Sequence, residues 1–195
     1  MSDDIFTPEE IASQIKTALG DAMLDSRVQI RTEGVKKREN RNVWITIKPW
    51  SVHAAAEALI DISYPHLSCI SAFDKGADSE FLGVQYIFSI YGGIARKETM
   101  VIFSLDLPKK NPVLPTLTDI MEGTAFTERE KTEYIGITIE GLPPAEHNFF
   151  LPQDFPKGIY PLRKDDKKIP DTMVKNLWAC GRPENRPPAP LGGEE

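Results

Sequence analysis

Residues 81–105 read FLGVQYIFSIYGGIARKETMVIFSL, which is two apolar runs separated by a glycine pair and a charged connection. Phe81–Tyr91 and Thr99–Leu105 are rich in aromatic and β-branched residues, as is typical of strands. Gly92 and Gly93 follow the first run, where a turn is needed, and they lack the spacing of a phosphate-binding loop. This stretch predicts an antiparallel hairpin.

The flanking sequence supplies further strands and helices. Thr7, Pro8 and Glu10 form a capping-box pattern before an apolar stripe that runs from Ile11 to Ala22, which predicts a first helix. Further strands are predicted at Val28–Thr32, Val43–Ile47 and Leu67–Ala72, and further helices at Ala54–Ile62 (with Ser51 as its cap), Leu114–Met121 and Phe126–Tyr134. The sum predicts an α+β fold, with a mixed or antiparallel sheet and helices packed on one of its faces.

Regular patterning fades after Leu142, where proline becomes frequent. Residues from 182 onward carry Pro, Gly and charge, and such a segment alone cannot bury enough surface to offset its ordering entropy. Five apolar side chains nevertheless interrupt the polar C-terminal region: Leu151, Phe155, Tyr160, Leu162 and Trp178. We therefore divide the chain into an α+β scaffold (1–125), a docking segment (126–165) and an extended Pro-rich tail (166–195), which packs on its own domain or lies along another protein.

Composition excludes several classes of protein. The formal net charge of -6 over 195 residues argues against nucleic-acid binding, which requires a basic face. The acidic start is unlike a signal peptide, and no apolar run is long enough to span a membrane, so we expect a cytoplasmic protein that reaches a membrane only through a partner. Cys69 and Cys180 are too far apart for a metal site, and Cys69 lies in an apolar run that predicts a buried position.

No catalytic arrangement emerges from the remaining polar residues. The three histidines lie on different predicted elements without metal-binding spacing, and no nucleophile motif is present, so we expect no cofactor and no metal in this chain. Glu128-Arg129-Glu130 predicts either a solvated helix, in which Arg129 pairs with Glu133 at i,i+4, or an interface helix. Arg163 lies either in a simple basic turn or where its guanidinium can bind a carboxylate of a neighbouring chain.

Residues 126–165 read FTEREKTEYIGITIEGLPPAEHNFFLPQDFPKGIYPLRKD, and their order of motifs resembles the C-terminal signature of the 30 kDa subunit family of respiratory complex I. That family also supplies a subunit to membrane-bound energy-converting hydrogenases. The residues that fit its pattern are Leu117, Ile120, Gly123, Phe126, Glu128–Glu130, Gly136-Ile137, Leu151-Pro152, Asp154-Phe155, Gly158 and Pro161–Asp165. Residues 141–147 depart from it, because they lack the family's Gly-His-Pro-Asp-Leu-Arg-Arg.

The resemblance implies a structural subunit without chemistry of its own, in the peripheral arm of an ion-translocating oxidoreductase complex. The departures suggest the branch found in ferredoxin-linked, membrane-bound [NiFe] hydrogenases or in sulfur-reducing relatives, with quinone-reducing complexes and a free-standing adaptor as alternatives. Partners would be the large catalytic subunit and the small Fe–S subunit, which hold the Fe–S clusters and a Ni-Fe centre. The expected interface residues are Glu128, Arg129, Glu130, Phe155, Tyr160, Arg163, Asp165 and Trp178, since buried aromatic and Arg side chains dominate interface energetics.

Overall fold

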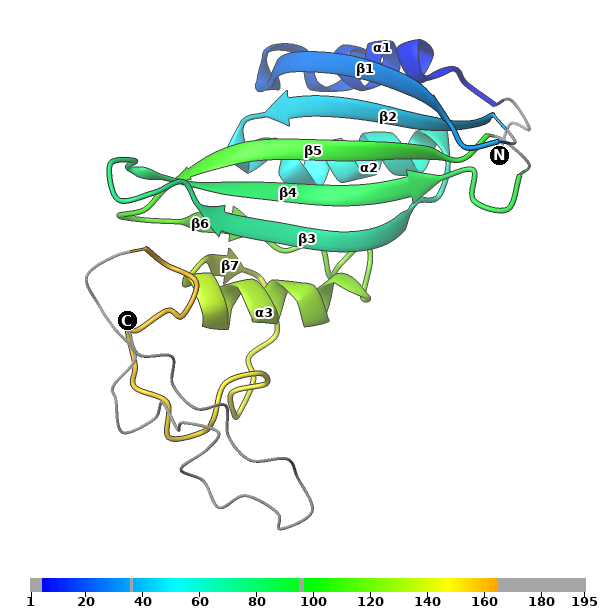
Figure 1. The fold of residues 1–195 in the computed structure, drawn as a ribbon. Helices are drawn as coiled ribbons and strands as arrows, with labels where there is room; N and C mark the ends of the chain where they lie inside the picture. The colour runs from blue at the N-terminus through cyan, green and yellow to red at the C-terminus, as the bar shows by residue number, and fades with distance from the viewer. Residues whose placement is uncertain (1–4, 36, 95–96, 165–195) are drawn as a thin grey trace, which may run out of the picture.

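The hairpin predicted at residues 81–105 is formed by β4 (Phe81–Ile90) and β5 (Thr99–Pro108), which pair antiparallel with Ile90 opposite Thr99. The structure is a computed structural model and describes residues 5–35, 37–94 and 97–164. Both strands contribute nearly continuous buried side chains, because both lie inside a five-stranded sheet with the order β1-β2-β5-β4-β3. β5 is its central strand, and β4 is the neighbour of β5. The hairpin is therefore the centre of the core (Figure 1).

The other strands extend this hairpin on both sides. β3 (His66–Asp74) pairs antiparallel with β4, and β2 (Arg38–Ile47) pairs parallel with β5. β1 (Met23–Glu33) forms an antiparallel hairpin with β2, and it is longer than the predicted Val28–Thr32. One parallel pair among antiparallel ones makes the sheet mixed, so the predicted α+β class is confirmed.

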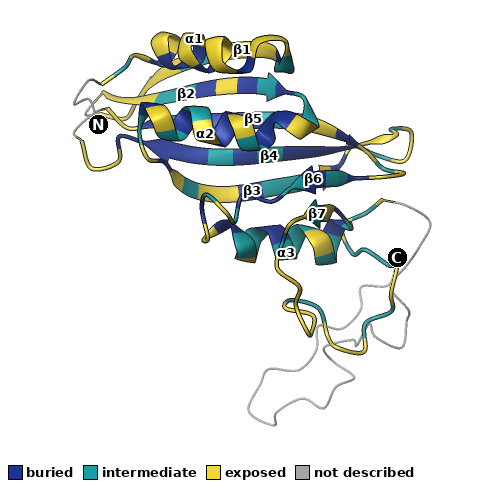
Figure 2. Cartoon of the chain, turned by 180° about the vertical axis from the view of Figure 1, so that it is seen from behind, coloured by how far each residue is buried: buried dark blue, intermediate teal, exposed yellow. Residues whose placement is uncertain are grey.

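Helices α1 (Pro8–Leu19) and α2 (Val52–Ile62) lie side by side on one face of the sheet (Figure 2). Thr7 and Glu10 form the predicted capping box at the start of α1. Short 3-10 turns precede β1 (η1, Gly20–Ala22) and α2 (η2, Pro49–Ser51). Ser51 occupies the position before α2 as predicted, but its hydroxyl donates to the Lys48 carbonyl oxygen (2.7 Å) rather than capping the helix.

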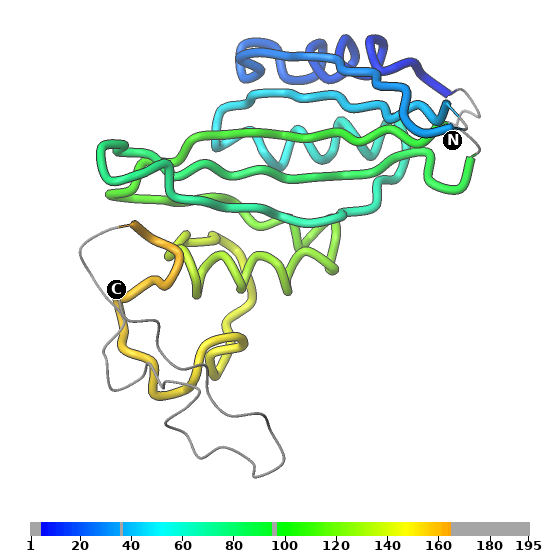
Figure 3. The backbone as a smooth tube through the Cα atoms, viewed as in Figure 1, coloured from blue at the N-terminus to red at the C-terminus, as the bar shows by residue number. Residues whose placement is uncertain are grey.

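Helix α3 (Thr124–Ile135) lies along the β3 edge of the sheet, and the chain after it loops away and returns (Figure 3). The predicted helix at Leu114–Met121 is wrong. Its first residues belong to β6 (Val113–Pro115), which pairs parallel with β7 (Thr138–Glu140) in a separate two-stranded sheet. The burial predicted for Cys69 is also wrong, because β3 is an edge strand and this thiol is exposed.

Among the residues that the structure describes, no helix is long and apolar enough to cross a membrane.

Candidate functional site

The carboxylate of Glu128 points from α3 into the interior and is fully buried. It accepts hydrogen bonds from the Thr116 hydroxyl (2.6 Å) and from the Leu117 main-chain N–H (2.8 Å), and so holds the chain between β6 and α3. Burial raises the pKa of Glu128 above its usual value, although these hydrogen bonds act in the opposite direction. In this structure Glu128 stabilises its own domain and does not reach the surface.

Glu133, one turn further along α3, binds the loop that follows β7. Its two carboxylate oxygens accept from three consecutive main-chain N–H groups, those of Phe149 (2.6 Å), Phe150 (2.8 Å) and Leu151 (2.8 Å). Hydrogen bonds to a charged acceptor are stronger than neutral ones. Glu133 thus fastens this part of the loop to α3, and this arrangement replaces the predicted Arg129–Glu133 pair.

Three phenylalanine rings meet where this loop crosses α3, and we call Phe126, Phe149 and Phe150 the aromatic patch. The Phe126 ring centroid lies 5.2 Å from that of Phe149 and 4.8 Å from that of Phe150, both edge-to-face. Phe126 is 53% exposed and Phe149 is 55% exposed, although each is a large apolar side chain. A contiguous exposed apolar patch of this kind marks an interaction surface.

Arg163 and Tyr160 close the end of α3. The helix ends at Gly136, which has a left-handed φ of 74°, and the Tyr160 ring packs against the space where a Cβ would lie. Arg163 donates from Nε to the Ile135 carbonyl oxygen (2.7 Å) and from Nη2 to that of Gly136 (3.3 Å), while its guanidinium stacks 5.0 Å from the Tyr160 ring centroid. A cation at a helix C-terminus is favourable there. Of the two roles predicted for Arg163, the turn is present, since its main-chain N–H donates to the Tyr160 carbonyl oxygen (3.0 Å), and binding to a carboxylate of a neighbouring chain stays a prediction.

Asp74, buried at the end of β3, anchors the last described residue. It forms an ion pair with Lys109 (2.6 Å), and it accepts from the main-chain N–H groups of Gly76 (2.9 Å) and Lys164 (3.0 Å). Burial alone would raise the pKa of Asp74, but these hydrogen bonds outweigh burial and the pKa is lowered. The segment after α3 is therefore tied at both its middle and its end.

The remaining predicted interface residues lie in different settings. Arg129 is half-buried, donates to the Pro143 carbonyl oxygen (3.1 Å) and lies over the Phe149 ring. Glu130 forms an ion pair with Lys131 (2.6 Å), and Phe155 is half-buried in the loop. Asp165 and Trp178 lie outside the described residues. Their role at an interface stays a prediction, as does that of the others.

Sequence reasoning missed two parts of this region. Glu133 was named only as a partner of Arg129, and the aromatic patch was not predicted, although Phe149-Phe150 inside a polar, proline-rich loop is a signal that could have indicated it. A second missed cluster joins α2 to the connection before α3, where His53 binds Asp119 (2.8 Å) and lies 3.5 Å from the Glu57 carboxylate. The hydrogen bond with Asp119 is the main cause that raises the pKa of His53.

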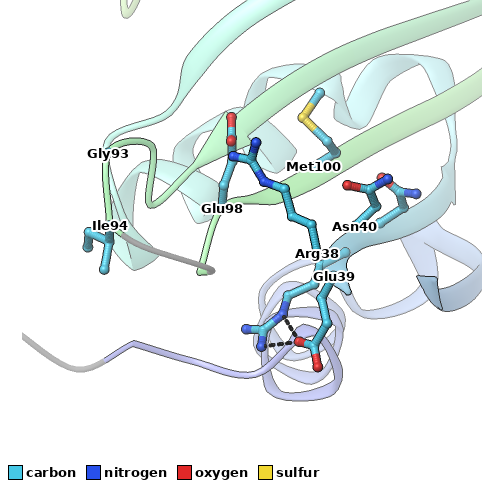
Figure 4. Close-up of a pocket in the computed structure, with 9 residues that line it drawn as sticks. Arg38, Glu39, Asn40, Gly93, Ile94, Glu98 and Met100 are labelled. Carbon is cyan, nitrogen blue, oxygen red and sulfur yellow. Dashed lines mark hydrogen bonds and ion pairs between the residues drawn. The ribbon is translucent and has the colours of Figure 1, made fainter. Parts of the chain in front are cut away.

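A separate hollow lies outside the α3 region. A polar hollow of about 530 Å³ lies at the far end of the sheet, lined by Arg38, Asn40, Glu98 and Met100 among others, and Arg41 holds Glu39 there by two hydrogen bonds (Figure 4). Within the described ranges, no three His, Cys, Asp or Glu side chains converge as metal ligands.

Comparison with known proteins gives one family. Residues 45–171 match the model of the respiratory-chain NADH dehydrogenase 30 Kd subunit. The membrane-bound hydrogenase subunit beta of Pyrococcus furiosus is 47% identical over 76 residues, which are 39% of this chain and 43% of that protein, so this match spans less than half of that relative. The chloroplastic NAD(P)H-quinone oxidoreductase subunit J of Daucus carota is 28% identical over 121 residues, which are 62% of this chain and 74% of that protein.

Two solved structures share the fold. A chain of the membrane-bound sulfane sulfur reductase, an archaeal respiratory membrane complex, superposes with a TM-score of 0.63 at 20% identity, over 80% of this chain and 83% of that one. A trypsin-resistant fragment of Nqo5 gives a TM-score of 0.52 at 21% identity, over 71% of this chain and the whole of that one.

Proposed function

Because the chain belongs to the 30 kDa subunit family of respiratory-chain NADH dehydrogenase, we propose that it is a non-catalytic structural subunit of a membrane-bound, ion-translocating redox complex. It sits in the peripheral arm on the cytoplasmic side of the membrane. There it braces the large catalytic subunit against the small Fe–S subunit, and those partners hold the Fe–S clusters and the Ni-Fe centre.

A ferredoxin-oxidising, membrane-bound [NiFe] hydrogenase is the complex we favour. The relative at 47% identity is named as a hydrogenase subunit, whereas the quinone oxidoreductase subunit is 28% identical. The departure of residues 141–147 from the family pattern agrees with this choice.

The aromatic patch is the observation that carries the docking role. Edge-to-face aromatic pairs bury large apolar areas when a partner covers them, and such residues dominate interface energetics. Here the hydrogen bonds to Glu133 hold Phe149 and Phe150 against Phe126 at the surface. A surface that is ordered before binding loses less conformational entropy when the partner arrives.

Purification of the tagged full chain from detergent-solubilised native membranes, with mass spectrometry and metal analysis, tests this function. Nickel and iron with Fe–S and membrane-arm subunits would support the hydrogenase. Iron without nickel would move the assignment to a sulfur- or quinone-reducing relative. Recovery of the chain alone, without other subunits or metal, would overturn the subunit role and favour a free-standing adaptor.

A variant pair then tests the surface. The double substitution Phe126→Ser and Phe149→Ser should leave the domain folded and reduce recovery of the other subunits. Trp50→Ser is the matched control, because Trp50 is an aromatic side chain that is 70% exposed and lies outside the aromatic patch. Equal recovery with both variants would refute the role of the patch.

A further inference from the structure

One edge of β7 carries unpaired main-chain groups. Towards β6, the Thr138 N–H donates to the Pro112 carbonyl oxygen and the Glu140 carbonyl accepts from the Thr116 N–H, each at 2.8 Å. Successive residues of a parallel strand point their main-chain groups to opposite sides. The N–H and C=O of Ile139 therefore point away from β6, and none of the residues that the structure describes hydrogen-bonds to them.

This free edge opens into a groove. Its volume is about 780 Å³, and it lies between β7, the Arg129–Glu133 turn of α3 and the loop of residues 142–157. Such a space is large enough for a short extended peptide, and three parts of this chain line it. We call it the β7 groove.

The β7 groove has donors that lack acceptors. A guanidinium carries five N–H donors, and among the residues that the structure describes, the Pro143 carbonyl oxygen is the one acceptor for Arg129, 3.1 Å from Nη2. The Nε–H of Arg129 is buried without an acceptor. The carboxylate of Glu133, at i,i+4 from Arg129 on α3, is already occupied by three main-chain N–H groups.

The Nε–H is buried, so a ligand in the groove would reach the Nη groups of Arg129 instead. A carboxylate there would accept from these charged donors in the two-bond fork that arginine favours. An extended backbone beside β7 would satisfy Ile139 in the way that a peptide adds a strand to an exposed sheet edge. One ligand chemistry therefore meets both unfilled requirements.

We propose that the β7 groove receives an extended segment of another subunit of the complex, which pairs with Ile139 and places an Asp or Glu carboxylate on Arg129. This inference rests on the proposed function and adds a site, a binding mode and a recognition chemistry to it. The aromatic patch lies beside the groove, because the Arg129 guanidinium is 6.0 Å from the Phe149 ring centroid. The segment would continue from the groove onto the patch.

Photo-crosslinking within the native complex tests the occupant. A photo-reactive benzoyl-phenylalanine is introduced at Thr132, an exposed residue that lines the groove, in the tagged full chain. The expected adduct is one short acidic peptide of another subunit, identified by mass spectrometry. The same probe at Ser26, exposed on β1, is the control and should not yield that peptide.

Arg129→Gln should lower the yield of this adduct at least about tenfold, because it removes the charged fork. Arg129→Lys keeps the charge but loses the fork, so its adduct yield should lie between those of the unchanged chain and Arg129→Gln. Arg27→Gln removes an equal charge from an exposed position on β1 and should have no effect. Urea unfolding of each variant verifies that the fold is retained.

Two outcomes would overturn the inference. Crosslinks from Thr132 to this chain's own residues 165–195 would make the groove a self-binding site, and no adduct in an intact complex would leave it without a partner. Either result leaves the proposed function standing, because the other subunits are still recovered. Failure to recover those subunits with the unmodified chain would instead refute the proposed function.

Discussion

Replacing Glu128 by glutamine and by alanine separates the hydrogen bonds of this buried side chain from its charge. The carboxylate is fully buried and accepts from Thr116 and Leu117. Glutamine is nearly isosteric and can keep both contacts, since its amide oxygen accepts from the Leu117 N–H and its NH₂ group donates to the Thr116 oxygen. Alanine keeps neither contact.

The expected magnitudes differ accordingly. In Glu128→Ala the buried Leu117 N–H loses its acceptor, which costs about 1–3 kcal/mol. An unfilled cavity of about 40 Å³ adds about 1 kcal/mol. We therefore expect Glu128→Ala to lower the free energy of unfolding by about 2–4 kcal/mol. Glu128→Gln should stay within about 1 kcal/mol of the natural chain at pH 7, because it also removes the cost of burying a charge.

The pH dependence has a definite sign. Burial raises the folded-state pKa of Glu128, whereas the unfolded value is about 4.3. The native state therefore binds this proton more tightly, so the contribution of Glu128 to stability is fully present below about pH 4.3 and is lost as the pH rises through the folded pKa. The stability difference between Glu128→Gln and the natural chain should shift in favour of the glutamine variant as the pH rises through this window.

Urea unfolding of the full chain at pH 7 and pH 5, followed by circular dichroism, measures both effects. Glu122→Gln, an exposed change just before α3, is the control and should alter neither the midpoint nor its pH dependence. If Glu128→Gln destabilises the protein as much as Glu128→Ala, the charge itself is required and the reasoning is refuted.

Three further changes test the contacts around α3. Gly136→Ala should lower the free energy of unfolding by at least about 1–2 kcal/mol, because φ is 74° and the added Cβ would collide with the Tyr160 ring. The control Gly123→Ala places its Cβ in open space at φ -60° and should be nearly neutral. Urea unfolding measures both. Glu133→Gln should accelerate hydrogen exchange of the Phe149, Phe150 and Leu151 amides about tenfold. The control Glu130→Gln should leave these exchange rates unchanged. Equal exchange rates in the two variants would contradict the role of Glu133. The raised pKa of His53 means that its stabilisation is present below its unfolded pKa of about 6.5 and lost as the pH rises through the folded value. Asp119→Asn should therefore flatten the dependence of the free energy of unfolding on pH between pH 6 and pH 8, by a small amount because Asp119 is exposed and His53 is only partly buried. An unchanged slope would exclude the pair as its source.

Local signals in the sequence were sufficient for most of the scaffold. The capping box at Thr7 and the turn glycines after β4 act over a few residues, so the pattern predicts α1 and the β4–β5 hairpin correctly. The error at Leu114–Met121 has a long-range cause. Leu114 pairs with Ile139 of β7, 25 residues further along the chain, and the main chain at Leu117 is held by Glu128, so helical spacing of apolar residues is overridden.

The candidate site shows the same division between local and long-range causes. An i,i+4 pair between Arg129 and Glu133 follows from helical spacing, but the acceptor is taken by amides 16–18 residues later. Cys69 was predicted to be buried, but its thiol is exposed. The exposure depends on the position of β3 at the sheet edge, which no local run of apolar residues indicates.

The residues that carry the family resemblance have mainly internal roles here. Glu128 holds the connection before α3, Gly136 gives the left-handed turn at its end, and Arg163 binds the last carbonyl groups of the helix. A signature composed of such residues specifies how the segment folds, and therefore identifies the family rather than the complex. Choice of partner must depend on side chains that face outward, such as Phe126 within the signature and Phe149 outside it, and on the donors of Arg129. Changes at these outward positions should alter assembly and leave the fold intact, whereas changes at the internal signature positions Glu128 and Gly136 should alter the fold first.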